Sequence, residues 1–293
     1  MPSGMRTTRA IAIGSLVLLA IAWGAIPLFV RAEIPPSHLV AMRVTLGAVV
    51  LVLFSMATRR FTIPRHRWRG VAMLGTVLAA HWLSFFVALN LTTVAVTLAI
   101  LYIGPVLAAV LSGPVLHERV SRHAYAGLAV AVVGTLFVIR PGSGATVAGV
   151  VVAAISGVLL AAIMLLGKPL AADLGGVVVA TWELVVASVV LAPFTVQAVR
   201  ESAEYWPQFV ILGAVFTGLA GVVYWTSMRR LPVAVVSVIM YLEPASAVVW
   251  AALFLGEQPD LLTWLGVVLV VAAGTIATRG VPDEEVVGVA ETL

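Results

Sequence analysis

The chain alternates between long apolar runs and short polar connections. A membrane-spanning helix needs roughly 20 mostly apolar residues. Ten runs meet that length within a few residues: 11–30, 37–57, 70–90, 94–116, 123–140, 147–167, 176–199, 207–227, 233–255 and 261–279. Several connections carry helix breakers such as Pro35-Pro36 and Pro141-Gly142. The pattern predicts an all-α polytopic membrane protein with ten transmembrane helices.

Two stretches of the chain repeat each other at an offset of 139 residues. Val94–Gly127 and Val233–Gly266 share 11 of 34 positions, where chance in so Ala- and Val-rich a chain gives about 3 or 4. The matched residues include Tyr102 with Tyr241, Pro105 with Pro244 and Glu118 with Glu257. We therefore expect two five-helix repeats, residues 1–140 and 141–281, followed by a short acidic cytoplasmic tail at 282–293.

An odd number of helices in each repeat has a topological consequence. If the first repeat begins on one side of the membrane, the second must begin on the other. Inverted repeats of this kind place a substrate site near the bilayer midplane, where the two halves meet. The sequence thus predicts a transporter that works by alternating access.

Composition supports the membrane class and excludes several others. Hydrophobic residues make up 62% of the chain and charged residues 10%, against about 25% charged in soluble domains. The absence of cysteine excludes disulfides and thiolate metal sites, and we expect neither a metal nor a cofactor. The pI near 10 would suit a nucleic-acid partner, but the basic residues lie in the loops between apolar runs, so no such partner is expected.

Those basic residues also predict the orientation. Thirteen lie at one set of alternate connections: Arg6, Arg9, Arg59, Arg60, Arg65, Arg67, Arg69, Arg119, Arg122, Lys168, Arg229, Arg230 and Arg279. The other set holds Arg31, Arg140 and Arg200. Because basic loops stay in the cytoplasm, both termini are predicted to be cytoplasmic.

Four arginine, histidine or glutamate residues lie well inside the apolar runs, away from their ends: Arg43, His81, Glu183 and Glu243. Such groups are costly in hydrocarbon, so a functional role is the first hypothesis and a structural hydrogen bond is the alternative. Arg43 and Glu183 fall at opposite depths and should not pair. His81 and Glu243 fall near mid-depth, and Glu243, with His81, is the candidate for coupling transport to proton movement.

The repeated prolines predict two kinked helices. Pro105 and Pro244 each remove a helical hydrogen bond and free a carbonyl four residues back. A kink that lines a cavity and a static kink are both compatible with this. Tyr102 and Tyr241 lie three residues earlier, where they could form pocket walls.

Aromatic residues inside the spans extend the expected pocket. The substrate-binding candidates are Trp23, His81, Trp82, Tyr102, Tyr241 and Glu243. Small residues on the fifth and tenth runs, Gly127, Gly134, Gly266 and Ala273, predict close helix packing instead.

Taken together, these features resemble the EamA-type transporters of the drug/metabolite transporter superfamily. Each repeat has a proline followed thirteen residues later by a glutamate, Pro105 to Glu118 and Pro244 to Glu257, and His81-Trp82 resembles a variant of the first repeat. The resemblance implies a ten-helix secondary transporter of a bacterial cytoplasmic membrane, whose relatives often export amino acids, metabolites or toxic compounds. This chain departs from a symmetric pattern, because Gly104 stands where the second repeat has Glu243.

The sequence therefore favours a secondary transporter, most simply an exporter, with a small-molecule substrate and the lipid bilayer as partners, as a monomer or a homodimer. A non-transporting scaffold or sensor and an intramembrane enzyme are the alternatives. An enzyme would need a nucleophile–base set or metal ligands, and the chain has no Gly-x-Ser-x-Gly elbow, zinc-protease motif or nucleotide-binding loop.

Overall fold

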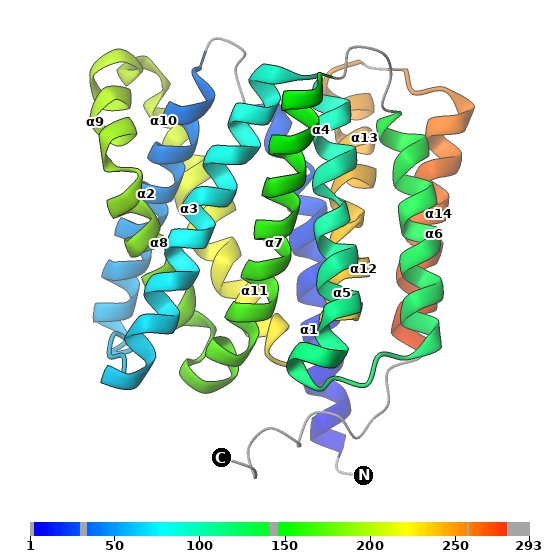
Figure 1. Cartoon of the computed structure of the whole chain (residues 1–293), viewed down its shortest axis with the longest axis horizontal. Helices are drawn as coiled ribbons and strands as arrows, with labels where there is room; N and C mark the ends of the chain where they lie inside the picture. Colours follow the sequence, from blue (N-terminus) through cyan, green and yellow to red (C-terminus); the bar gives the residue numbers. More distant parts are fainter. Residues whose placement is uncertain (1–2, 30–33, 141–145, 257, 280–293) are drawn as a thin grey trace.

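The computed structural model describes residues 3–29, 34–140, 146–256 and 258–279, which form a bundle of helices packed side by side (Figure 1). Among these residues, nine helices are long and apolar enough to cross a membrane, or ten when one bent pair counts as a single span. The all-α membrane class is thereby confirmed. Arg31, Pro141-Gly142, Glu257 and the predicted acidic tail lie outside the described residues.

The first half of the chain contains six α-helices and two short 3₁₀ segments. They are α1 (Ser3–Trp23), a 3₁₀ turn (Ile26–Phe29), α2 (Pro36–Ala57), a second turn (Arg65–Arg67), α3 (Trp68–Leu91), α4 (Val94–Leu101), α5 (Ile103–Leu116) and α6 (Arg122–Ile139). Capping side chains set two of the starts. The hydroxyls of Thr93 and Ser121 accept hydrogen bonds from the free amides of Val96 and Ala124, respectively.

The second half is less regular. It comprises α7 (Val147–Leu174), α8 (Gly176–Val190), α9 (Ala192–Glu201), a 3₁₀ turn (Ala203–Tyr205), α10 (Trp206–Val210), a π-helix η4 (Ile211–Leu219), α11 (Ala220–Met228), α12 (Val233–Met240), α13 (Leu242–Phe254) and α14 (Leu261–Arg279). The segments α10, η4 and α11 form one continuous span, Ala203–Met228.

The helices share two common ends. The start of α1, the end of α14 and the α2–α3 connection, which carries Arg59, Arg60 and Arg65, lie at one end of the bundle (Figure 1). We call this the basic end. The end of α6 and the start of α14, which Arg140 and Asp260 adjoin in the chain, lie at the opposite end (Figure 1).

Two predicted spans differ from the observed helices. The run 176–199 bends by 74° at Leu191 and becomes α8 and α9, where Pro193 lies in the first turn of the new helix, the position that proline favours. The run 147–167 continues to Leu174, so that Lys168 lies inside α7 and not in a loop. The charge of Lys168 is tolerated there because it pairs with Glu118 at the end of α5.

The predicted close packing of small residues is observed between α6 and α14. A Cβ added to Gly127 would lie 2.8 Å from the carbonyl oxygen of Ala273, and one added to Gly134 would lie 2.8 Å from that of Gly266. Only glycine lets the backbones approach so closely. In the 139-residue repeat, Gly127 corresponds to Gly266 and Gly134 corresponds to Ala273. The two contacts are therefore equivalent, as expected when a contact is repeated about a twofold axis.

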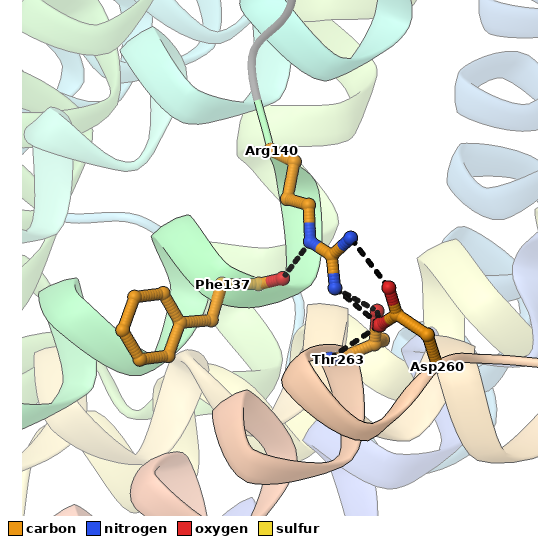
Figure 2. Close-up of polar contacts among 4 residues, drawn as sticks. All are labelled: Phe137, Arg140, Asp260 and Thr263. Atoms are coloured by element: carbon orange, nitrogen blue, oxygen red, sulfur yellow. Dashed lines mark hydrogen bonds and ion pairs between the residues drawn. The ribbon is translucent and has the colours of Figure 1, made fainter.

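An ion pair joins the same two helices at the end opposite the basic end. Figure 2 shows the guanidinium of Arg140 beside the carboxylate of Asp260, which also accepts hydrogen bonds from the amide and hydroxyl of Thr263. Hydrogen bonding to Arg140, and then to Thr263, holds the pKa of Asp260 well below its usual range. The contact anchors the start of α14 to the end of α6.

A second ion pair lies at the basic end. Glu118 pairs with Lys168, and the other oxygen of its carboxylate accepts a hydrogen bond from the amide of Val233 at the start of α12, 2.8 Å away. Lys168 also donates to the carbonyl of Leu231 at 2.5 Å. We call this set, Glu118, Lys168, Leu231 and Val233, the latch. It ties α5, α7 and the start of α12 together.

The packing of the two repeat-related half-helices is unequal. All eight residues of α12, next to the latch, are buried. In α4, its counterpart at the opposite end, Val94 is 61% exposed and Leu98 to Leu101 are partly exposed. The bundle is therefore packed more tightly around α12 at the basic end.

Candidate functional site

Two helices are broken at corresponding points in the middle of the bundle. Tyr102 separates α4 from α5, and Tyr241 separates α12 from α13. Each break falls one turn before a proline, where the proline leaves a carbonyl without its helical donor. The interruption places polar backbone and a tyrosine ring at the same point of both helices.

The two tyrosines meet. Their ring centroids are 5.2 Å apart, and the hydroxyl of Tyr241 donates a hydrogen bond to the carbonyl oxygen of Tyr102 at 2.5 Å. The hydroxyl of Tyr102 in turn interacts with the carboxyl group of Glu243. Two of the predicted site residues are thus in direct contact, and a third interacts with one of them.

Arg43 faces this group from α2. Its guanidinium lies 4.8 Å from the centre of the Trp82 ring, and its Nε donates to the hydroxyl of Thr217 at 2.9 Å. Arg43 and Glu243 attract each other. They form no direct ion pair in the described structure, since no guanidinium nitrogen of Arg43 lies within 4.0 Å of a carboxyl oxygen of Glu243. Two opposite charges therefore face the same interior region without neutralising each other by contact.

We call Arg43, Trp82, Tyr102, Thr217 and Glu243 the central cluster. Arg43 is only 6% exposed, whereas Glu243 and Trp82 are partly exposed. An isolated charge in such a place is strongly unfavourable, and each charge here has the other, an aromatic face or a hydroxyl near it. The arrangement presents one basic and one acidic side chain to the same interior region.

The remaining pocket candidates lie at the edge of this cluster. The ring of His81 is 5.4 Å from that of Trp82, but its Nδ1 lies 3.0 Å from the carbonyl oxygen of Ser156, which attaches α3 to α7. The indole of Trp23 donates to the carbonyl oxygen of Phe216, the residue before Thr217. Both residues therefore support neighbours of the cluster, and neither forms a hydrogen bond or ion pair with Glu243 in the described structure.

Sequence reasoning missed the contribution of Thr217. This residue lies in the π-helix η4, where its hydroxyl donates to the carbonyl oxygen of Leu212, five residues back. A lone threonine in an apolar run gives no local signal, because threonine is common in membrane helices. The π-helix that presents it packs closely against α2, where a Cβ on Gly213 would collide with Leu46.

Glu183 lies apart from the central cluster. One of its carboxyl oxygens accepts a hydrogen bond from the indole of Trp225 at 2.5 Å. Glu183 forms no ion pair with Arg43 in the described structure, in agreement with the different depths predicted for the two residues.

Comparison with known proteins agrees with this architecture. The model of the EamA-like transporter family matches residues 10–140 and again residues 147–279. The chain belongs to this family. Its members are transporters, so the EamA-like chain described here is a multi-pass membrane transporter and not an enzyme.

Several individual proteins resemble this EamA-like transporter along most of their length. The "Uncharacterized transporter YxxF" of Bacillus subtilis is 23% identical over 92% of this chain and 90% of its own. The "Probable terminal-alkyne amino-acid exporter" of Streptantibioticus cattleyicolor is 28% identical, with 92% and 93% covered. The "Pseudopaline exporter CntI" of Pseudomonas aeruginosa is 27% identical, with 85% and 88% covered.

A solved crystal structure shares the fold. It aligns with a TM-score of 0.78 and 21% identity, over 94% of this chain and 98% of the other. At that identity the likeness concerns the fold alone.

Proposed function

We propose that this protein exports a small zwitterionic metabolite, of the amino-acid type, across the cytoplasmic membrane by alternating access. The observation that carries the proposal is the pair of opposite charges, Arg43 and Glu243, in the central cluster. Arg43 would bind the carboxylate of the substrate and Glu243 its ammonium group, with Trp82 and Tyr102 against the rest of the molecule. Charge-assisted hydrogen bonds of both kinds are strong in a dry site.

The relatives support this substrate class. Two of them carry names that describe exporters, one of an amino acid and one of pseudopaline. The charges of the central cluster suit a ligand with an amino group and a carboxylate.

The transport mechanism rests on the repeat. The reciprocal contacts Gly127–Ala273 and Gly134–Gly266, and the meeting of Tyr102 with Tyr241, support two inverted halves that exchange conformations. If the basic end lies in the cytoplasm, the latch would close the inner side, and under this proposal the conformation described here is the inner-closed state.

For energy coupling, Glu243 and His81 stay the candidates predicted from the sequence. Glu243 precedes Pro244 at the break between α12 and α13, where a small movement would change its contact with water. If Glu243 carries the proton, Glu243→Gln abolishes proton-driven accumulation and retains substrate exchange. If Glu243 only binds the substrate ammonium group, both activities are lost.

The test of the proposed function is transport by the purified protein in liposomes. Vesicles loaded with unlabelled amino acids should accumulate labelled amino acid from outside by counterflow. Arg43→Gln should reduce that uptake at least tenfold, whereas Glu204→Gln, which changes an exposed carboxyl away from the cluster, should leave it unchanged. Uptake that survives in Arg43→Gln would contradict the assigned site.

A further inference from the structure

A second intramembrane carboxyl has surroundings unlike those of Glu243. Glu183 on α8 is 5% exposed. One oxygen accepts the hydrogen bond from the Trp225 indole, and the other is buried with no hydrogen-bond partner in the described structure. Trp225 itself is fully buried against Gly167 of α7, where any Cβ would collide with the indole ring. The contact is rigid and excludes solvent.

The described structure places no cation beside this carboxyl. Titratable groups on the helices packed around α8 have other partners: Arg43 with Thr217, His81 with Ser156, and Lys168 with Glu118. Tyr224, next to Trp225, interacts with Glu183 electrostatically and brings no positive charge. An ionised carboxylate buried without a counter-charge is very unfavourable, whereas its neutral acid form is tolerated.

Glu183 lies close to the basic end. Its chain neighbour Trp182 donates a hydrogen bond to the carbonyl oxygen of Phe61 in the α2–α3 connection, at 2.9 Å. Thr181 is hydrogen-bonded to Ser55, near the end of α2. A modest separation of α8 from α11 at this end would therefore bring water to the carboxyl.

One span connects Glu183 to the central cluster. Thr217, which binds Arg43, and Trp225, which binds Glu183, both belong to the span Ala203–Met228. The π-helix in this span has an irregular hydrogen-bonding pattern of a kind that often marks functional sites. A shift of the span would change both contacts together.

We propose that Glu183 is a proton-binding site, separate from the substrate site, that holds a proton while the basic end is closed and releases it to water when that end opens. The inference rests on the proposed alternating-access function. No other chemical change is involved: the O–H bond of the acid breaks and the proton passes to cytoplasmic water. The Trp225 indole, a hydrogen-bond donor, stays with one oxygen in the closed state.

The direction in which pH shifts the equilibrium between the open and closed states follows from their different affinities for the proton. Because the closed state binds the proton more tightly than the open state, acid favours the closed state and a rise in pH favours opening. For a single linked proton, the ratio of open to closed protein changes by up to about tenfold per pH unit.

Opening can be measured directly because the chain has no cysteine. Ser237 on α12 is fully buried, and its hydroxyl has no hydrogen-bond partner among the described residues, so Ser237→Cys is a mild change. We would measure the labelling rate of this cysteine by a maleimide in the purified protein as pH rises. Thr62→Cys, an exposed position in the α2–α3 connection, corrects for the pH dependence of the thiol itself.

The expected result is that the corrected rate for Ser237→Cys rises with pH and that Glu183→Gln, a permanently neutral isostere, removes this rise. Glu183→Asp, which keeps the acid, should retain a pH response and controls for general damage to the fold. Glu204→Gln, which changes an exposed carboxyl away from the cluster, should keep the full response. The inference is overturned if Glu183→Gln responds like the parent protein. Because no substrate is present, a protein that fails to transport amino acids could still pass this test.

Discussion

The latch at the basic end offers the most quantitative prediction. Lys168→Met keeps the length and apolar stem of the side chain but removes the ammonium group. Glu118 is then left with the amide of Val233 as its described partner, and the carbonyl of Leu231 loses a donor. The variant should destabilise the inner-closed state relative to the open state.

The magnitude follows from the burial of the pair. The side chains of Glu118 and Lys168 are 13% and 17% exposed. Removing one partner of a fully buried pair costs about 3–5 kcal/mol, and the residual contact with water reduces this to about 2–3 kcal/mol. At about 1.4 kcal/mol per factor of ten, the open population should rise about 30- to 150-fold.

The assay is the labelling of Ser237→Cys in the parent and in Lys168→Met. The labelling rate should rise in proportion to the open population until that population approaches one half. Adding Glu118→Gln to Lys168→Met should recover part of the effect, because the amide can still accept from Val233 and leaves no buried charge. An unchanged labelling rate in Lys168→Met would refute the assignment of these residues as a latch.

Three further predictions concern the fold and its orientation. Gly134→Ala should lower the unfolding temperature in detergent, since overpacking by about 1–3 kcal/mol exceeds the helix-propensity gain of about 1 kcal/mol, whereas Gly274→Ala, where a Cβ meets nothing within 4 Å, should not lower it. Asp260→Asn should lower the unfolding temperature at neutral pH. Because the Arg140 contact depresses the pKa of Asp260, this difference should persist in mild acid and vanish only below the usual aspartate range, as a pH series of melting curves would show. Arg65→Cys should resist an impermeant maleimide in intact cells and react after the membrane is opened; labelling in intact cells would reverse the proposed topology.

Much of the fold was predictable because membrane helices are long and uniformly apolar. The run lengths predict the helices, and the repeat predicts that Tyr102 and Tyr241 occupy matching positions. The bend at Leu191 had a signal in Pro193, which the surrounding apolar run obscured. The extension of α7 beyond Gly167 had none, because the partner that compensates Lys168 lies on another helix, 50 residues earlier in the chain.

The candidate site was only partly predictable for a related reason. A rare charged residue in an apolar run is visible in the sequence, so Arg43 and Glu243 could be named. Their relation could not, because it depends on how α2 and α13 pack. The role of Thr217 could not be named either, because it depends on the packing of the π-helix against α2, which brings its hydroxyl to Arg43.

The central claim is that Arg43 and Glu243 recognise the two charges of one zwitterion, and matched ligands test it most directly. Counterflow of a labelled amino acid would be competed with the unlabelled parent, its N-acetyl derivative and its carboxamide. In the parent protein, both derivatives should compete at least tenfold more weakly than the amino acid. Glu243→Gln should lose discrimination against the N-acetyl derivative alone, and Arg43→Gln against the carboxamide alone. Equal loss of both preferences in each variant, or no preference in the parent protein, would contradict the account.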